Sequence, residues 1–217
     1  MKTDTQLQQD VGAELQWEPS VDAAQIGVAV KDGVVTLSGD VASYAEKWHA
    51  ERAAQRVHGV KALAVTMQVR LAGPSKRSDA DIARAAENVL EWTTTLPADA
   101  VKVMVEGGWV TLSGQVDWQY QKEAAADAVR ALLGVTGVSD QIAIRSSATT
   151  GAVKSDIEAA LKRRARADAQ QITVAVQGAD VTLSGMVHNW TERELATNAA
   201  WGTPGVRNVI DKMVLAY

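Results

Sequence analysis

The pentapeptide Val-Thr-Leu-Ser-Gly occurs three times in this chain, at 35–39, 110–114 and 181–185. Successive copies lie 75 and then 71 positions apart. At these offsets, nine of the sixteen residues around the motif are identical between the first and second copies, and nine between the second and third. A period of this length is typical of tandem structural units, so one small fold repeated three times is the main constraint on the architecture.

The same spacing extends well beyond the motif. A Gly-Val pair follows the motif glycine by 20 residues in every copy. Short segments of small and polar residues at 72–75 and 146–151 favour turns and mark the seams. We therefore define repeat 1 as 1–72, repeat 2 as 73–146 and repeat 3 as 147–217.

Each repeat is expected to fold as helix–strand–strand–helix–strand. Apolar residues four positions apart predict a first helix with one buried stripe. Two alternating apolar runs around a tight turn predict a β-hairpin. An alanine-rich stripe then predicts a second helix that packs close to a sheet, and a last alternating run predicts a third strand. The first-helix stripes are Leu7, Val11 and Leu15, then Ile82, Ala86 and Leu90, then Val153, Ile157 and Leu161.

The fold class is therefore α+β. It comprises three tandem αββαβ units, each with a small three-stranded mixed sheet and two helices on one face. The other face of each sheet carries the Thr and Ser of the motif, such as Thr36 and Ser38, and is expected to be open or to contact a neighbouring repeat or partner. The third hairpin has Gly178-Ala179 where the first two have a glycine at the second turn position, which allows its turn to shift by one position.

Charge and composition exclude several classes of protein. The chain has 22 Lys and Arg against 26 Asp and Glu, a net charge of −4, which argues against nucleic acid as a partner. There are no cysteines, so disulfides, thiolate-bound zinc and a thiol nucleophile are excluded. Residues 1–6 show no apolar signal-peptide run, which predicts a cytoplasmic protein, or a periplasmic one if an export signal has been removed.

No pattern of catalytic or cofactor-binding residues is present. His49, His58 and His188 fall at unrelated repeat positions, without the spacing of a metal site. Neither a phosphate-binding Gly-Lys-Ser/Thr loop nor a Gly-x-Ser-x-Gly elbow occurs. We predict no enzyme activity, no catalytic residues, no cofactor and no metal.

The tryptophans are the most unusual part of the composition. There are seven Trp, three Tyr and no Phe. Trp17 and Trp92 align near the end of the first helix, where we expect them in the core or at its rim. Alternation along the strands places Trp109 and Met104 together on the open face of repeat 2. Such a patch either docks a partner or membrane interface, or is covered by a neighbouring repeat.

A basic segment near the end of the first helix of repeat 3 is a second candidate binding site. Its charged members are Lys162, Arg163, Arg164 and Arg166. One interpretation is structural, because cations stabilise a helix C-terminus. The other is contact with an anionic surface, at about 1 kcal/mol per basic residue near an anionic bilayer.

The hairpin with its Val-Thr-Leu-Ser-Gly strand, followed by an alanine-rich helix that ends in Gly-Val, resembles the BON domain. The resemblance covers nearly the whole chain as three tandem copies. It implies the αββαβ fold and no common catalytic centre. It also implies attachment to phospholipid membranes or other envelope components, often in osmotic or general stress, and OsmY-like members usually work in the periplasm.

We therefore expect a non-enzymatic, stress-associated BON protein that contacts a phospholipid membrane or an envelope partner. The alternative is a cytoplasmic protein-interaction scaffold or a self-assembling accessory protein, which the acidic charge and the apolar open-face residues Met186, Ile210 and Val214 favour. Vesicle binding distinguishes the two interpretations.

Overall fold

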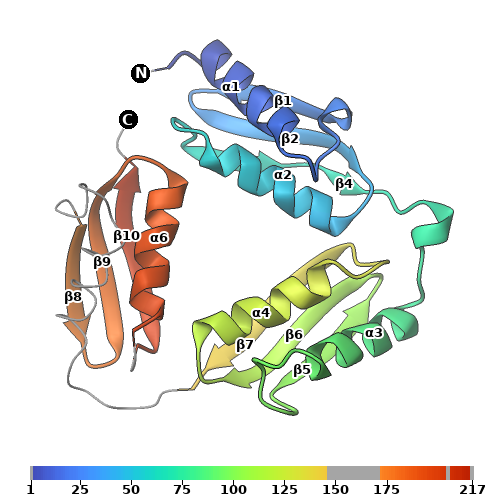
Figure 1. Cartoon of the computed structure of the whole chain (residues 1–217). Helices are drawn as coiled ribbons and strands as arrows, with labels where there is room; N and C mark the ends of the chain where they lie inside the picture. Colours follow the sequence, from blue (N-terminus) through green and yellow to red (C-terminus); the bar gives the residue numbers. More distant parts are fainter. Residues whose placement is uncertain (1, 146–171, 204–205, 216–217) are drawn as a thin grey trace. The chain divides into compact units, whose positions relative to one another are not determined.

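The computed structural model describes residues 2–145, 172–203 and 206–215 and contains three small mixed sheets (Figure 1). Repeat 1 consists of α1 (Asp4–Trp17), η1 (Ala23–Gln25), β1 (Ile26–Lys31), β2 (Val34–Val41), α2 (Tyr44–Arg56), β3 (Ala62–Val65) and β4 (Gln68–Val69). Repeat 2 follows a short η2 (Gly73–Ser75) and consists of α3 (Asp79–Glu91), β5 (Val101–Glu106), β6 (Trp109–Val116), α4 (Gln119–Arg130) and β7 (Gly137–Ile144). The described part of repeat 3 contains β8 (Ile172–Gln177), β9 (Asp180–Val187), α6 (Trp190–Trp201) and β10 (Asn208–Leu215).

The predicted α+β fold is confirmed. The second strand lies in the centre of each sheet, antiparallel to the first strand of its hairpin. The third strand runs parallel to it in repeats 1 and 3. In repeat 1 the third strand is interrupted into β3 and β4. At the interruption, Thr66 donates both its N–H and its hydroxyl to the Leu37 carbonyl, at 2.8 and 3.2 Å.

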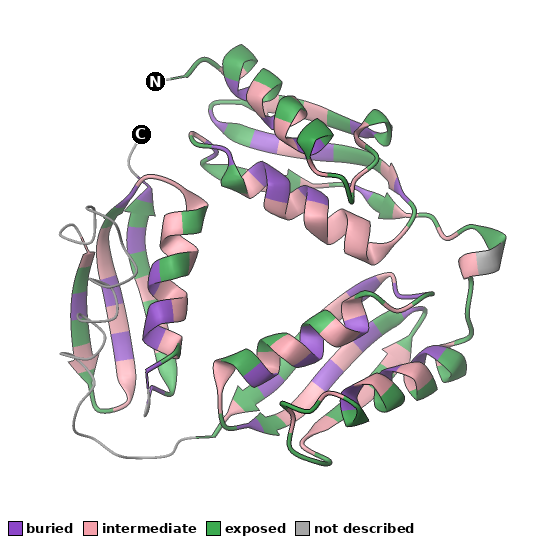
Figure 2. Ribbon diagram, viewed as in Figure 1, coloured by how far each residue is buried: buried purple, intermediate pink, exposed green. Residues whose placement is uncertain are grey.

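In repeats 1 and 2, both helices cover one face of the sheet. In repeat 1, the stripe Leu7, Val11 and Leu15 packs with Val35 and Leu37 in one buried core (Figure 2). The corresponding stripe of α3 packs in the same way in repeat 2. The predicted first helix of repeat 3 lies outside the described residues. The face that carries no helix is called the open face below.

Local hydrogen bonds fix where the helices begin. Thr3 and Gln6 form the predicted capping box of α1, with side chain–backbone distances of 3.2 and 3.0 Å. Ser43 and Asn189 likewise accept a backbone N–H at the starts of α2 and α6. These caps satisfy N–H groups that have no partner inside the helix.

An aspartate at the start of the first helix holds the hairpin turn. Asp4 accepts hydrogen bonds from the N–H groups of Asp32 and Gly33, at 2.8 and 3.0 Å. Asp79 does the same for Gly107 and Gly108, at 2.8 and 2.9 Å. Each carboxylate therefore ties the helix to a turn 28 to 29 residues away.

The third hairpin does not shift its register. Gln177 pairs with Asp180, just as Glu106 pairs with Trp109, so its turn also has two residues. Gly178 has a φ of +62°, whereas Ala179 is not among the positive-φ residues of the described chain. The difference between the turns is in backbone conformation: the first two turns need two positive φ angles and the third needs one.

The glycine that ends the repeated motif is required by the fold. Gly39 has a φ of +124°, and a Cβ built there would lie 2.0 Å from the Gln25 carbonyl oxygen. Gly114 has a φ of +136°, and the same construction places its Cβ 2.0 Å from the Ala100 oxygen. Only glycine adopts this backbone region without strain. The motif therefore marks a close approach of two backbones rather than a chemical site.

Candidate functional site

Trp109 and Met104 both lie on the open face of repeat 2. Their side chains are 51% and 60% exposed. Met104 pairs with Thr111 and Trp109 pairs with Glu106 across the β5–β6 hairpin. The two side chains are thus diagonal neighbours, whose Cβ atoms are typically about 7–8 Å apart and within reach of long side chains. The strand alternation placed them correctly, and their role in binding stays a prediction.

Trp109 also packs against its own sheet. A Cβ built at Gly137 on the neighbouring strand β7 would lie 2.3 Å from two carbon atoms of the indole ring. The ring therefore lies directly over the backbone of Gly137, in the space that a side chain at position 137 would fill. An aromatic side chain over a cross-strand glycine stabilises the sheet, so Trp109 supports repeat 2 with part of its surface and presents the rest to solvent.

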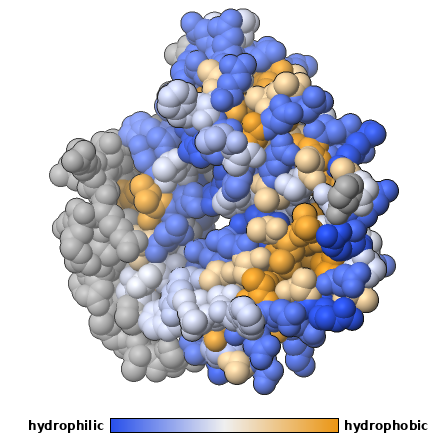
Figure 3. All heavy atoms as spheres, turned by 45° about the vertical axis from the view of Figure 1, so that its right-hand side comes forward, coloured by the Kyte–Doolittle hydropathy of each residue, from blue (hydrophilic) through white to orange (hydrophobic). Residues whose placement is uncertain are grey.

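Repeat 3 carries its own apolar patch on the open face. Met186 on β9 pairs directly with Val214 on β10, and the two are 53% and 62% exposed. Ile210 lies on the same face of β10 and is 40% exposed. On the face of the molecule that Figure 3 displays, hydrophobic side chains gather into separate patches among hydrophilic ones.

The open face of repeat 1 is different in character. Ala29 stands at the position of Met104, and Val34 at that of Trp109. Thr36 and Ser38 complete a face of small and polar side chains. Since repeat 1 folds with these small residues, the larger side chains of repeats 2 and 3 are not demanded by the fold itself.

The prediction for Trp17 and Trp92 was wrong. Their side chains are 83% and 84% exposed rather than in the core or at its rim. Each lies two positions after the last residue of the buried stripe, Leu15 or Leu90. Two helical steps rotate a side chain by about 200° around the axis, so both indoles face away from the sheet.

The other predicted basic site, at Lys162, Arg163, Arg164 and Arg166, lies outside the described residues.

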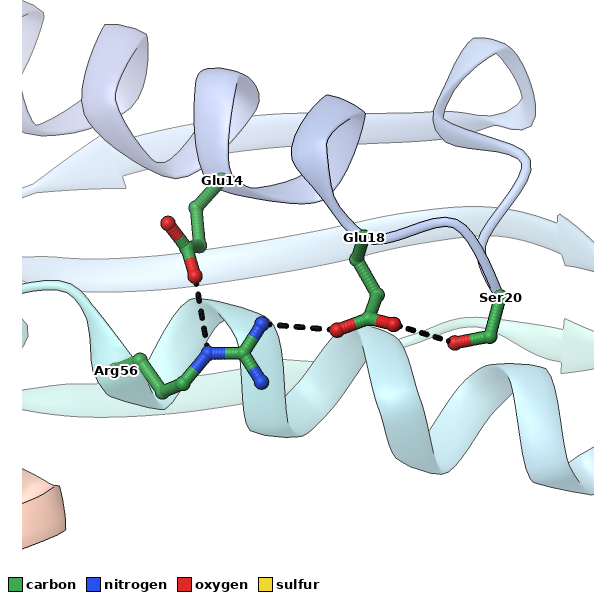
Figure 4. A network of polar contacts seen from close by, with 4 residues as sticks. All are labelled: Glu14, Glu18, Ser20 and Arg56. Atoms are coloured by element: carbon green, nitrogen blue, oxygen red, sulfur yellow. Dashed lines mark hydrogen bonds and ion pairs between the residues drawn. The ribbon is translucent and has the colours of Figure 1, made fainter.

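A polar network joins α1 to α2 and has a structural role (Figure 4). Arg56, in the last turn of α2, contacts Glu14 through Nε and Glu18 through a terminal nitrogen, both at 2.9 Å. Ser20 donates a 2.8 Å hydrogen bond to Glu18. The bonds from Arg56 and Ser20 lower the pKa of the Glu18 carboxyl and, reciprocally, Glu18 raises the pKa of Arg56.

The described residues contain no group of three or more His, Asp or Glu placed to hold a metal ion. Within the same ranges, no helix has the length and apolar character needed to cross a bilayer. His188 contacts Glu192 at 3.1 Å, and His49 lies edge-on to Trp48 with ring centroids 5.2 Å apart. These are local contacts at the second helices of repeats 1 and 3.

The three units correspond to a known family. The chain matches the BON domain over residues 3–70, 78–146 and 149–217. It belongs to the BON domain family. This BON protein is also 32% identical over 143 residues to the osmotically-inducible protein Y of Escherichia coli (strain K12), a match that covers 64% of this chain and 71% of that one.

Solved structures give only distant matches to this BON protein. CdsD, a structural protein of the type III secretion system of Chlamydia trachomatis, is 15% identical with a TM-score of 0.27, covering 96% of this chain and 91% of that one. The periplasmic domain of the type III secretion inner membrane protein PrgH from S. typhimurium is 14% identical with a TM-score of 0.24, covering 90% and 95%. Scores this low carry no conclusion about fold or function.

Proposed function

We propose that this BON protein is a non-catalytic, stress-associated binding protein whose open faces in repeats 2 and 3 contact the phospholipid surface of a membrane. Family membership and the 32% identity to an osmotically-inducible protein support the association with stress. The lack of a common catalytic centre in the BON domain family supports a binding role.

The observation that carries the proposal is the difference between the repeats. Met104 and Trp109 stand where repeat 1 has Ala29 and Val34, and the larger residues remain half exposed. Exposed apolar side chains are unfavourable in water unless something covers them during function. Indole rings in particular favour the boundary between water and the lipid headgroups.

Electrostatics distinguishes the two candidate contacts with lipid. With a net charge of −4, the chain as a whole gains little from an anionic bilayer. Binding through the open face buries apolar surface and is therefore insensitive to salt. Binding through Lys162, Arg163, Arg164 and Arg166 would instead be screened as the salt concentration rises.

The test is co-sedimentation with phosphatidylcholine vesicles, with and without phosphatidylglycerol, at low and high salt. We expect the wild-type chain to sediment at both salt concentrations. A double variant, Met104→Gln with Trp109→Ala, should lose most of this binding. The matched control is Val34→Ala in repeat 1, at the position of Trp109, which should bind as wild type.

Circular dichroism of the double variant shows whether repeat 2 remains folded, since Trp109 also packs on Gly137. If the folded double variant sediments as well as wild type, the open face of repeat 2 is not the contact. If wild type does not sediment with either vesicle, a phospholipid partner is excluded under these conditions.

A protein partner or a second copy of the chain is the other candidate occupant of these faces. Met186 and Val214, paired on neighbouring strands at an edge of the repeat 3 sheet, favour it because apolar residues beside a strand edge are typical of association sites. Light scattering over a dilution series tests self-association. A constant monomer mass would exclude it.

A further inference from the structure

Among the described residues, none bonds to the backbone groups along the outer edge of β5 in repeat 2. The two-residue turn makes Glu106 and Trp109 a hydrogen-bonded pair, so alternate residues of β5 direct their N–H and C=O groups away from β6. These residues are Val101, Val103 and Val105. Since β5 is an edge strand of its sheet, the groups face outward.

In repeat 1, the equivalent outward carbonyl on the edge strand β1 is capped, that is, hydrogen-bonded by a side chain from the first helix. Val28 is the counterpart of Val103, and its carbonyl accepts a 2.8 Å hydrogen bond from the side-chain amide of Gln8 on α1. That bond confirms that the carbonyl at this position points outward. In repeat 2, Ala83 stands at the position of Gln8, and its methyl group cannot donate a hydrogen bond.

A groove lies beside the uncapped edge. It has a volume of about 770 Å³, and its lining includes the last turns of α3, the loop before β5 and β5 itself. Its lining carries three carboxylates, Glu87, Glu91 and Asp99, and one cation, Lys102, which alternation along β5 places on the same side of the strand as Met104. None of the three carboxylates has an ion pair within the described ranges of the chain. In repeat 1 the corresponding positions are Gly12, Gln16 and Ala24, so repeat 1 lacks this charge.

We propose that this groove binds an extended peptide segment that adds a strand to the edge of β5 and carries basic residues. The outward N–H and C=O groups of β5 select an extended backbone. Ala83, Glu87 and Glu91 are spaced four apart on α3 and follow one stripe of the helix. The carboxylates of this stripe favour Lys or Arg on the helix side of the added strand.

The opposite side of the same strand would lie next to Met104 on the open face. Because side chains alternate along a strand, the preferred partner has basic residues alternating with apolar ones. This proposal concerns a strand edge and a peptide, whereas the proposed function concerns sheet faces and lipid, so the two can fail independently.

The probe is the capped hexapeptide Lys-Val-Lys-Val-Lys-Val, titrated into the ¹⁵N-labelled full-length chain and followed by NMR. We expect amide shifts at Val101, Val103 and Val105 that saturate with peptide. Replacing lysine with glutamate in the peptide, or methylating all of its backbone nitrogens, should weaken binding by about tenfold or more, because each removes one of the two recognition elements.

Ala83→Gln is the decisive variant, since it introduces the cap that repeat 1 already tolerates. It should lower peptide affinity by about tenfold while leaving vesicle binding unchanged. Glu87→Gln with Glu91→Gln should lower affinity and reduce its salt dependence, since only the Asp99 carboxylate remains in the groove. The control is Gln8→Ala, which uncaps an edge in repeat 1 that has no carboxylates and should create little binding.

Several results would overturn the proposal. One is the absence of shifts at millimolar peptide. Another is equal affinity for the N-methylated peptide, which would mean that no strand is added. A third is unchanged affinity in a folded Ala83→Gln variant, which would place the peptide elsewhere.

Discussion

Replacing Gly39 with alanine is expected to unfold repeat 1 selectively. The backbone at this glycine has a φ of +124°, and the added Cβ would lie 2.0 Å from the Gln25 carbonyl oxygen. The oxygen belongs to the backbone and the position of Cβ is fixed by the backbone of residue 39, so no side-chain rotation can make room. Either β1 and β2 must separate at this end or Gly39 must change its conformation.

The magnitude follows from these two effects. A non-glycine residue in this region of backbone space costs about 1–3 kcal/mol. Forcing extra volume into a closely packed site costs about another 1–3 kcal/mol. A unit of this size has a total stability of only about 4–10 kcal/mol, so the expected loss is a large part of it.

Gly12→Ala is the matched control in the same repeat. Gly12 lies within α1, and nothing comes within 4 Å of a Cβ built there. Alanine should therefore stabilise repeat 1 by about 0.5–1 kcal/mol through its higher helix propensity. The same glycine-to-alanine change is thus expected to lower the stability of repeat 1 at position 39 and to raise it at position 12.

Hydrogen–deuterium exchange of the full-length chain, read peptide by peptide, resolves each repeat separately. In Gly39→Ala, peptides from repeat 1 should lose protection while those from repeat 2 keep it. In Gly12→Ala, protection of repeat 1 should rise. The argument from backbone approach is refuted if the two variants change the stability of repeat 1 by the same amount, or if Gly39→Ala leaves it within about 1 kcal/mol of wild type.

Three further outcomes follow from named contacts. Asp79→Ala should destabilise repeat 2 by about 1–2 kcal/mol, because it removes two charge-assisted hydrogen bonds to a hairpin turn; urea unfolding measures this, and an unchanged midpoint would contradict it. Glu18→Gln should flatten the acid dependence of repeat 1 stability. Since the Arg56 bond lowers the folded pKa of Glu18 below its ordinary 4.5, the stabilisation is present above that pH and is lost as pH falls through the lowered pKa, so an unaltered acid profile would count against the contact. Gly137→Ala should displace the Trp109 indole and lower the thermal midpoint of repeat 2, and an unshifted indole resonance would exclude the packing described.

The sequence determined much of the fold through short-range patterns. Steps of four along 7–15 and 82–90 identified the first helices, and the Thr3 cap identified one start. Alternation identified the hairpins and placed Met104 and Trp109 on one face. Such signals lie within a few residues, because helix and strand periodicities are local properties of the backbone.

The candidate site was predicted only in part for a related reason. Strand parity indicates on which face Trp109 lies, but not that it rests on Gly137, 28 residues further along. Trp17 and Trp92 were misplaced because their alignment between repeats suggested packing, whereas the helical phase turns both outward. Counting the rotation of about 100° per residue from Leu15 and Leu90 would have placed both tryptophans on the exposed side of their helices.

By itself, the amino-acid sequence specified a small unit copied three times, with its helices, its hairpins and the buried side of each. Only the tertiary structure decided why the motif glycine cannot carry a Cβ, which indole packs on a glycine, and which strand edge stays uncapped beside carboxylates. These features depend on the register between segments far apart in the chain, where a single position determines whether two groups touch.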